Sequence, residues 1–103
     1  MQITENIIKF GPVKHNAPQQ QRTFTLTNTG DGELIVRAVE TGGKVATTLM
    51  PRQRIPAGSS FTAKATLDPD RQEYGVVTDF VTIITNDPTR PMRRLRATAI
   101  VED

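Results

Sequence analysis

Strict alternation of apolar and polar side chains is the feature of this sequence that most constrains its fold. Residues 61–67 place Phe61, Ala63 and Leu67 on one side, while Thr62 and Lys64 fall on the other. Successive side chains of a strand point to opposite faces, so this period of two predicts a strand with one buried face. Nowhere does the chain hold the 3.6-residue apolar period of an amphipathic helix. The chain is therefore expected to be all-β.

Six further segments carry signs of strands: residues 7–13, 22–27, 33–41, 45–49, 76–85 and 92–101. The connections between them are rich in residues that form turns and stop ladders, as in Asn28-Thr29-Gly30-Asp31-Gly32, Ile55-Pro56-Ala57-Gly58 and Asn86-Asp87-Pro88. About seven short strands separated by such turns predict an antiparallel β-sandwich.

The length and composition agree with one sandwich. The chain has 103 residues, which we expect to form a single domain over residues 1–103. It contains no cysteine, so it has no disulfide, no thiolate metal site and no thiol catalysis. No apolar run reaches the roughly 20 residues that a membrane span needs.

Alternation also predicts which side chains form the core between the two sheets. Each predicted core residue lies on the apolar side of an alternating segment: Phe24, Leu26, Phe61, Ala63, Leu67, Val81, Ile83, Leu95 and Ala97.

A cluster of arginines, Arg90, Arg93, Arg94 and Arg96, is the most distinctive surface feature of a chain whose net charge is only +2. On a strand, Arg94 and Arg96 point outward, because Leu95 and Ala97 take the core side. One interpretation is a basic patch that binds phosphate, another polyanion or an acidic protein. The other, which the residues favour, is a solvated strand whose charges prevent aggregation. No aromatic residue alternates with these arginines, so nucleic-acid binding is not expected.

The residues offer little for catalysis or metal binding. His15 is the single histidine and stands in a polar connection without a nucleophile signature. Asp68, Asp70 and Glu73 cluster in a turn-rich segment, where solvation explains them. The loop carboxylates that could bind calcium show no dense acidic pattern: Asp31, Asp68, Asp70 and Asp87. We predict no catalytic residue, no metal site and no cofactor.

Four short segments occur in order along the chain: Phe10-Gly11-Pro12-Val13, Phe24-Thr25-Leu26-Thr27-Asn28-Thr29-Gly30, Ile55-Pro56-Ala57-Gly58-Ser59 and Ile84-Thr85-Asn86-Asp87-Pro88. Their order resembles the Hydin-like (ASH) and major-sperm-protein group of immunoglobulin-like domains, over about residues 10–101. Within that group, the chain is most similar to a bacterial branch known as a domain of unknown function.

The resemblance implies a seven-stranded immunoglobulin-like sandwich that acts as an interaction or spacer module, without cofactor or catalytic residues. It favours an extracytoplasmic location, periplasmic or secreted. Many bacterial members carry a Cys-Gly-Cys after the third strand, where this chain reads Thr41-Gly42-Gly43-Lys44. No metal or redox role of those cysteines can operate here.

Three functions compete at this stage. The first is a protein-interaction or spacer module, one domain of a longer, exported protein. The second is a ligand-binding module for a polyanion or carbohydrate around Arg94 and Arg96. Sugar sites usually present exposed aromatic platforms, however, and the chain has no Trp and one Tyr. The third, an enzyme, is not expected. The expected partner is another protein or a neighbouring domain of the same chain.

Overall fold

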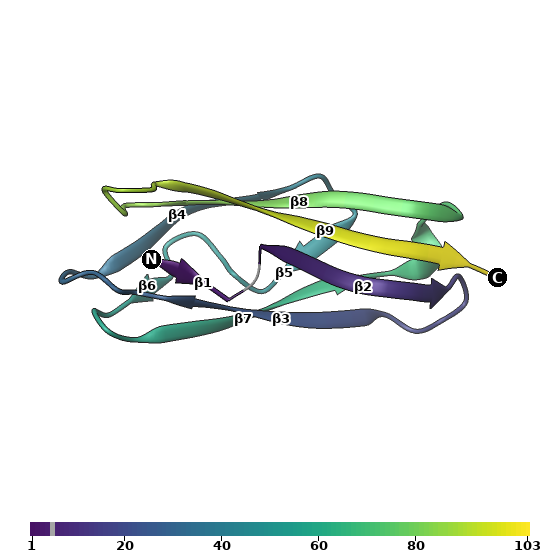
Figure 1. The fold of residues 1–103 in the computed structure, drawn as a ribbon, viewed down its shortest axis with the longest axis horizontal. Helices are drawn as coiled ribbons and strands as arrows, with labels where there is room; N and C mark the ends of the chain where they lie inside the picture. Colours follow the sequence, from purple (N-terminus) through teal and green to yellow (C-terminus); the bar gives the residue numbers. More distant parts are fainter. Residues whose placement is uncertain (5) are drawn as a thin grey trace.

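Two β-sheets face each other in the computed structural model, which describes residues 1–4 and 6–103 (Figure 1). The four-stranded sheet has the order β1-β3-β7-β5, formed by Gln2–Ile3, Gln20–Thr27, Ser60–Leu67 and Val45–Thr47. The five-stranded sheet has the order β2-β9-β8-β4-β6, formed by Ile7–Lys14, Met92–Glu102, Gly75–Thr85, Leu34–Thr41 and Arg54–Ile55. A single 3-10 turn, η1, covers Pro69–Arg71. The all-β sandwich predicted from alternation is confirmed.

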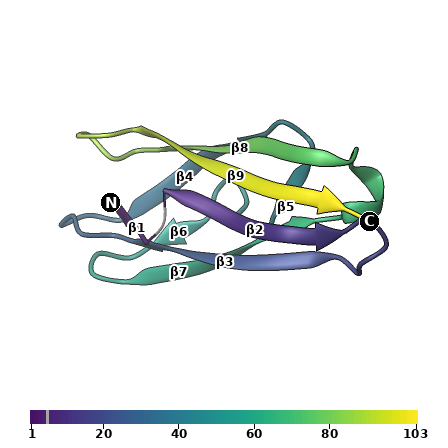
Figure 2. The same cartoon turned by 45° about the vertical axis from the view of Figure 1, so that its right-hand side comes forward.

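All seven predicted strands are present, and two very short ones were missed. β1 and β6 have two residues each, too few for any alternation to show in the sequence. Every ladder is antiparallel except one: the first long strand, β2, runs parallel to the last, β9. Figure 2 shows these two strands pointing the same way. Almost the whole domain connects them, so no tight turn forces them to be antiparallel.

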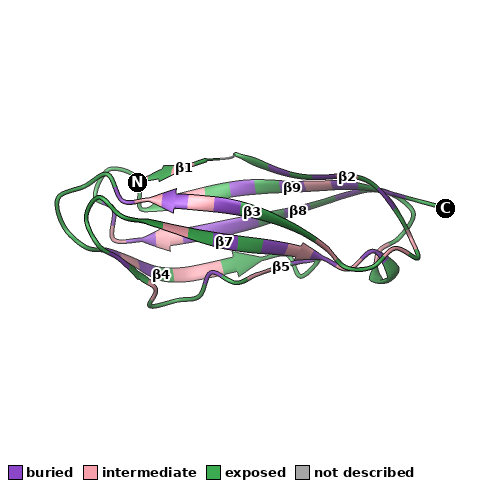
Figure 3. Ribbon diagram, turned by 90° about the horizontal axis from the view of Figure 1, so that it is seen from below, coloured by how far each residue is buried: buried purple, intermediate pink, exposed green. Residues whose placement is uncertain are grey.

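The core lies between the sheets, where the alternating apolar side chains meet (Figure 3). Of the nine predicted core residues, eight are buried: Phe24, Leu26, Ala63, Leu67, Val81, Ile83, Leu95 and Ala97. Phe61 packs against the core but is only partly buried. β5 pairs only with the far end of β7, from Ala65 to Leu67, so no strand flanks Phe61 on that side.

One side of the sandwich is closed by an arginine that links the two sheets. β1 pairs only with Leu26 and Thr27, which leaves the rest of β3 at a sheet edge. From that edge, the guanidinium of Arg22 donates hydrogen bonds to the carbonyls of Lys9 (3.2 Å) and Phe10 (3.1 Å) in β2. The same group lies 5.5 Å from the centre of the Phe10 ring. Arg22 therefore covers a strand edge that would otherwise offer backbone acceptors to another chain.

The segment after β4 is held by a buried carboxylate. Asp79, in β8, points to the core side and accepts backbone hydrogen bonds from Gly42 (2.8 Å), Lys44 (3.0 Å), Val45 (2.9 Å) and its neighbour Phe80 (2.8 Å). These bonds compensate the loss of water around a charged group. A Cβ atom at Gly42 would stand 2.2 Å from the Asp79 Oδ1 atom, so this position requires glycine.

Replacing Leu26 by alanine tests the core. Leu26 is fully buried, and the substitution should lower the free energy of unfolding by about 2–5 kcal/mol, because it removes apolar contacts and leaves a cavity. Chemical denaturation measures the change, with the exposed Thr23→Ala as control. A loss below about 0.5 kcal/mol, typical of surface positions, would show that Leu26 is not core.

Replacing Gly42 by alanine tests the carboxylate anchor. The new methyl group would collide with Asp79 and should lower the free energy of unfolding by about 1–3 kcal/mol, the usual cost of overpacking. Gly32→Ala is the matched control, because nothing lies within 4 Å of a Cβ at that position and its φ is not in the left-handed region. Equal stability of the two variants would contradict the anchoring role.

Candidate functional site

The outer face of the five-stranded sheet combines exposed apolar side chains with two arginines. Among the described residues, five of the seven exposed large hydrophobic side chains stand on this face: Ile7, Val76, Phe80, Met92 and Ile100. The strand register brings them beside the arginines. Phe80 of β8 and Ile7 of β2 both pair with Arg96 of β9, and Val76 pairs with Ile100. We call this surface, with Arg94 and Arg96, the β2-β9-β8 face.

Arg94 and Arg96 point outward side by side, as alternation predicts, and both are exposed. The Arg94 guanidinium lies 5.4 Å from the centre of the Phe80 ring, a cation–π contact. Its Nε also donates to the hydroxyl of Thr82, at 3.3 Å. Two neighbours on β8 therefore fix the position of this positive charge.

The other two arginines of the predicted patch lie elsewhere. Arg93 belongs to the opposite side of β9, is half-buried and donates to the carbonyl of Met1, at 3.3 Å. Arg90 is in the connection between β8 and β9, where it lines a hollow with Arg93 and the strand β1. The structure thus brings together Arg94 and Arg96 only.

Sequence reasoning missed the aromatic member of this face. Phe80 was one of four phenylalanines, and no aromatic residue is near the arginines in sequence. Alternation around the core residues Val81 and Ile83 could have placed Phe80 outward. Its position beside Arg96 depends on the pairing of β8 with β9, which the sequence pattern does not reveal.

The outer face of the four-stranded sheet has a different character. Its outward-facing positions on β3 and β7 carry mainly threonine and serine, some of which bond one another across the ladder. The hydroxyls of Thr25 and Thr62 lie 3.0 Å apart, and those of Thr27 and Ser60 lie 2.9 Å apart. None of the exposed large hydrophobic residues of the described chain lies on these two strands. The outer face of β3 and β7 is therefore polar and remains solvated.

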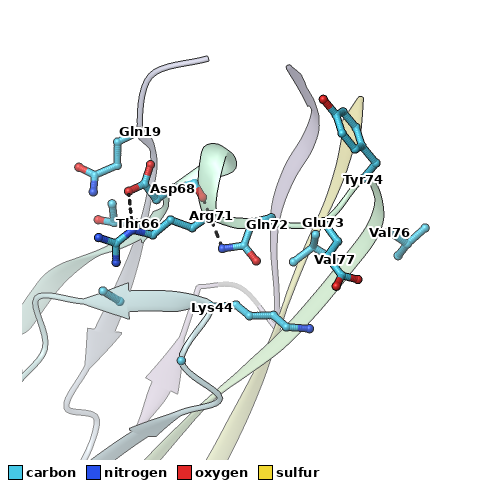
Figure 4. Close-up of a pocket in the computed structure, with 12 residues that line it drawn as sticks. Gln19, Lys44, Thr66, Asp68, Arg71, Gln72, Glu73, Tyr74, Val76 and Val77 are labelled. Atoms are coloured by element: carbon cyan, nitrogen blue, oxygen red, sulfur yellow. Dashed lines mark hydrogen bonds and ion pairs between the residues drawn. The ribbon is translucent and has the colours of Figure 1, made fainter. Parts of the chain in front are cut away.

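An open groove of about 590 Å³ lies at one end of the sandwich, between β5, η1 and the start of β8 (Figure 4). Its lining mixes both charges, with Lys44, Arg71, Asp68 and Glu73. Arg71 and Asp68 pair with each other at 3.7 Å, while a hydrogen bond with Asp70 raises the pKa of the Asp68 carboxyl. The charges of this groove largely compensate one another, so it does not select a ligand by charge.

Two of the predicted loop residues, His15 and Asp87, make local contacts. His15 is half-buried and its ring stacks on Tyr74, with 4.7 Å between the ring centres. Asp87 accepts hydrogen bonds from the Thr89 backbone and hydroxyl and from the Met1 amino group, and the amino group is the main cause that lowers the pKa of Asp87. Within residues 1–4 and 6–103, no three His, Asp or Glu side chains gather into a group able to hold a metal ion.

Removing divalent ions should leave the stability unchanged. Asp68 is in an ion pair, Asp87 is hydrogen-bonded within its turn, and the described residues contain no cluster of three ligating side chains, so we expect a chelator to extract no structural ion. The measurement is thermal unfolding with and without chelator. A melting temperature that falls by several degrees and is restored by calcium would establish a loop site.

Solved structures share this fold. A protein of unknown function from Porphyromonas gingivalis W83 superposes with a TM-score of 0.84 and 21% identity, covering 96% of this chain and 45% of that one. The ASH/PapD-like domain of human CEP192 gives a TM-score of 0.74 and 13% identity, covering 99% of this chain and 84% of that domain. The YadV chaperone gives 0.69 and 16%, covering 98% of this chain and 51% of the chaperone.

These likenesses confirm the immunoglobulin-like, ASH-type fold that the ordered segments indicated. The chain spans less than half the length of the Porphyromonas gingivalis protein. No curated protein matches the sequence at a significant level. The profile of one family, described as protein of unknown function (DUF1573), matches residues 1–101. Among the described residues, the structure contains no helix with the length and apolar character that a membrane crossing requires.

Proposed function

We propose that this chain, which belongs to the DUF1573 family, is a non-catalytic module that binds another protein through its β2-β9-β8 face. One observation carries the proposal: this face gathers exposed apolar side chains around Arg94 and Arg96, while the outer faces of β3 and β7 carry hydroxyls. Exposed apolar patches edged by polar groups are typical of protein-binding surfaces.

The composition of the face supports this function in energetic terms. Aromatic residues, methionine and arginine are enriched at protein interfaces relative to the rest of the surface. Phe80 is 41% exposed and Ile100 is 47% exposed, so a partner could bury a substantial part of each. The Arg94 side chain is already held by Phe80 and Thr82, which reduces the entropy lost on binding.

A sugar is a weaker fit to this face. Carbohydrate sites use an open aromatic ring as a platform, whereas Arg94 lies against the ring of Phe80. Tyr74 is exposed, but it stacks on His15 beyond the β2-β9-β8 face. A protein surface, which supplies both apolar and charged groups, suits the residues better than a carbohydrate.

The wider role in the proposal is that of one domain, residues 1–103, in a longer exported protein. The fold likeness to the YadV chaperone and to the periplasmic chaperone SfaE supports an interaction module with an extracytoplasmic location. The domain is elongated, 48 × 19 × 19 Å, and its two chain ends lie toward opposite ends of the long axis (Figure 1). A domain of this shape can also act as a spacer between neighbouring domains of the same chain.

Site-specific photo-crosslinking tests whether the β2-β9-β8 face binds a protein. A benzophenone amino acid at position 100 should give a discrete crosslinked product in the cells that produce the full protein, because Ile100 is exposed on β9, the middle strand of the face. The readout is the shift on a denaturing gel, followed by mass spectrometry.

The matched control is the same photoreactive residue at position 62, because Thr62 is exposed on the opposite sheet. Crosslinks of equal yield from both positions, or none from position 100, would contradict the proposed face. A crosslink only to another part of the same chain would identify the domain as a spacer that packs on its neighbour.

A further inference from the structure

We infer that the partner of the β2-β9-β8 face is an extended acidic segment of a protein, with apolar side chains flanking its carboxylates. This inference rests on the proposed function and adds the chemistry of the partner. It follows from positive charges of the face that form no ion pair among the described residues, from the spacing of the two arginines and from the apolar residues beside them.

The positive charges of the face have no carboxylate partner among residues 1–4 and 6–103. The ion pairs of the described chain join Met1 to Asp87, Lys14 to Glu102, Arg54 to Glu33 and Arg71 to Asp68. Arg94 and Arg96 are in none of them. Lys9, which pairs with Thr98 in the same ladder, adds a third exposed positive charge to the face. Two carboxylates lie near these charges: Glu102 pairs with Lys14, and the exposed Glu40 of β4, which is aligned with Thr82, is in none of these ion pairs. Lys9, Arg94 and Arg96 outnumber them, so this part of the surface is complementary to negative charge.

Arg94 is arranged as a donor for an incoming anion. Its guanidinium rests against the ring of Phe80, and its Nε is engaged with Thr82 at 3.3 Å. A guanidinium carries five N–H donors, so the four on its terminal nitrogens stay available for a carboxylate, which they can bind in a bidentate manner.

The spacing of the arginines favours an extended segment. Arg94 and Arg96 are two residues apart on one face of β9, which separates them by about 6.6–6.8 Å along the strand. Side chains at alternate positions of an extended peptide have the same separation. Two acidic residues at such positions can therefore meet both arginines while the residues around them contact the apolar side chains of the face.

Two other occupants fit the face less well. In symmetric contact with a second copy of this chain, the face would place Lys9, Arg94 and Arg96 opposite the same positive surface, and like charges repel. A polyphosphate or sulfated sugar would pair with the arginines but leave Phe80, Ile7 and Ile100 exposed to water. An acidic and apolar protein segment satisfies both sets of side chains.

Selection from a displayed library of random dodecapeptides tests the partner chemistry without knowledge of the partner. We expect peptides retained by the intact domain to be enriched in Asp or Glu at alternate positions with apolar neighbours. The variant R94Q/R96Q, which keeps polar side chains and removes both charges, should not retain them. Retained peptides without acidic enrichment, peptides held equally by the variant, or no retained peptide would each overturn the inference.

The affinity of the best selected peptide then separates charge from packing. In fluorescence anisotropy, R94Q/R96Q should weaken binding by about tenfold or more, since two charge-assisted contacts are lost. The control K64Q removes an exposed charge from the opposite sheet and should leave the affinity unchanged. Replacement of the acidic residues of the peptide by their amides should reproduce the loss. An unchanged affinity in R94Q/R96Q would overturn the inference.

Heparin distinguishes a polyanion from an acidic peptide. We expect the wild type and R94Q/R96Q to elute from heparin equally at physiological salt. Strong retention of the wild type alone, together with failure of the acidic peptides, would make the face a polyanion site and overturn the inference. If the crosslink from position 100 forms while acidic peptides fail, the face binds a protein and only the acidic chemistry is wrong.

Discussion

The register between β8 and β9 is the constraint on which both the core and the β2-β9-β8 face depend. These two strands, of 11 residues each, form a ladder that aligns Val81 with Leu95 and Phe80 with Arg96. The first pair lies in the core and the second faces outward. Because side chains alternate with a period of two, a slip by one residue would turn Leu95 outward and Arg96 into the core. Burial of the apolar side therefore fixes the positions of the exposed side chains that we assign to binding.

The two outer faces of the sandwich differ in the side chains that they expose: one carries hydroxyls, and the other carries apolar side chains and arginines. On β3 and β7, paired hydroxyls such as Thr25 and Thr62 satisfy each other and leave little for a partner to gain. The β2-β9-β8 face instead leaves apolar side chains in water, a cost that a partner can remove. Strand edges offer a competing route of association, and Arg22 blocks part of one by donating to two carbonyls of β2. This arrangement favours the proposed contact through a face over contact through an edge.

The sequence predicted what depends on local alternation and missed what depends on pairing. The seven predicted strands, eight of nine core residues and the outward direction of Arg94 and Arg96 all follow from a period of two. The parallel pairing of β2 with β9 and the place of Phe80 beside the arginines are non-local, so no pattern along the chain reveals them. The prediction grouped Arg90 and Arg93 with Arg94 and Arg96 because they are close in sequence. Successive residues of a strand point to opposite faces, so Arg93 lies on the other side of β9 from Arg94.

The buried carboxylate of Asp79 contacts both the loop after β4 and the backbone of Phe80, a residue of the β2-β9-β8 face. A carboxylate between Val77 and Val81 breaks the apolar side of β8, and no alternation rule predicts it. Four backbone N–H groups hold it, three from the segment 42–45 and one from Phe80. The loop is thus fixed without a thiol. The same carboxylate accepts a hydrogen bond from the Phe80 N–H, and the Phe80 ring lies against Arg94. We therefore expect that a change which loosens the Asp79 contacts with the loop also disturbs the position of the Phe80 ring.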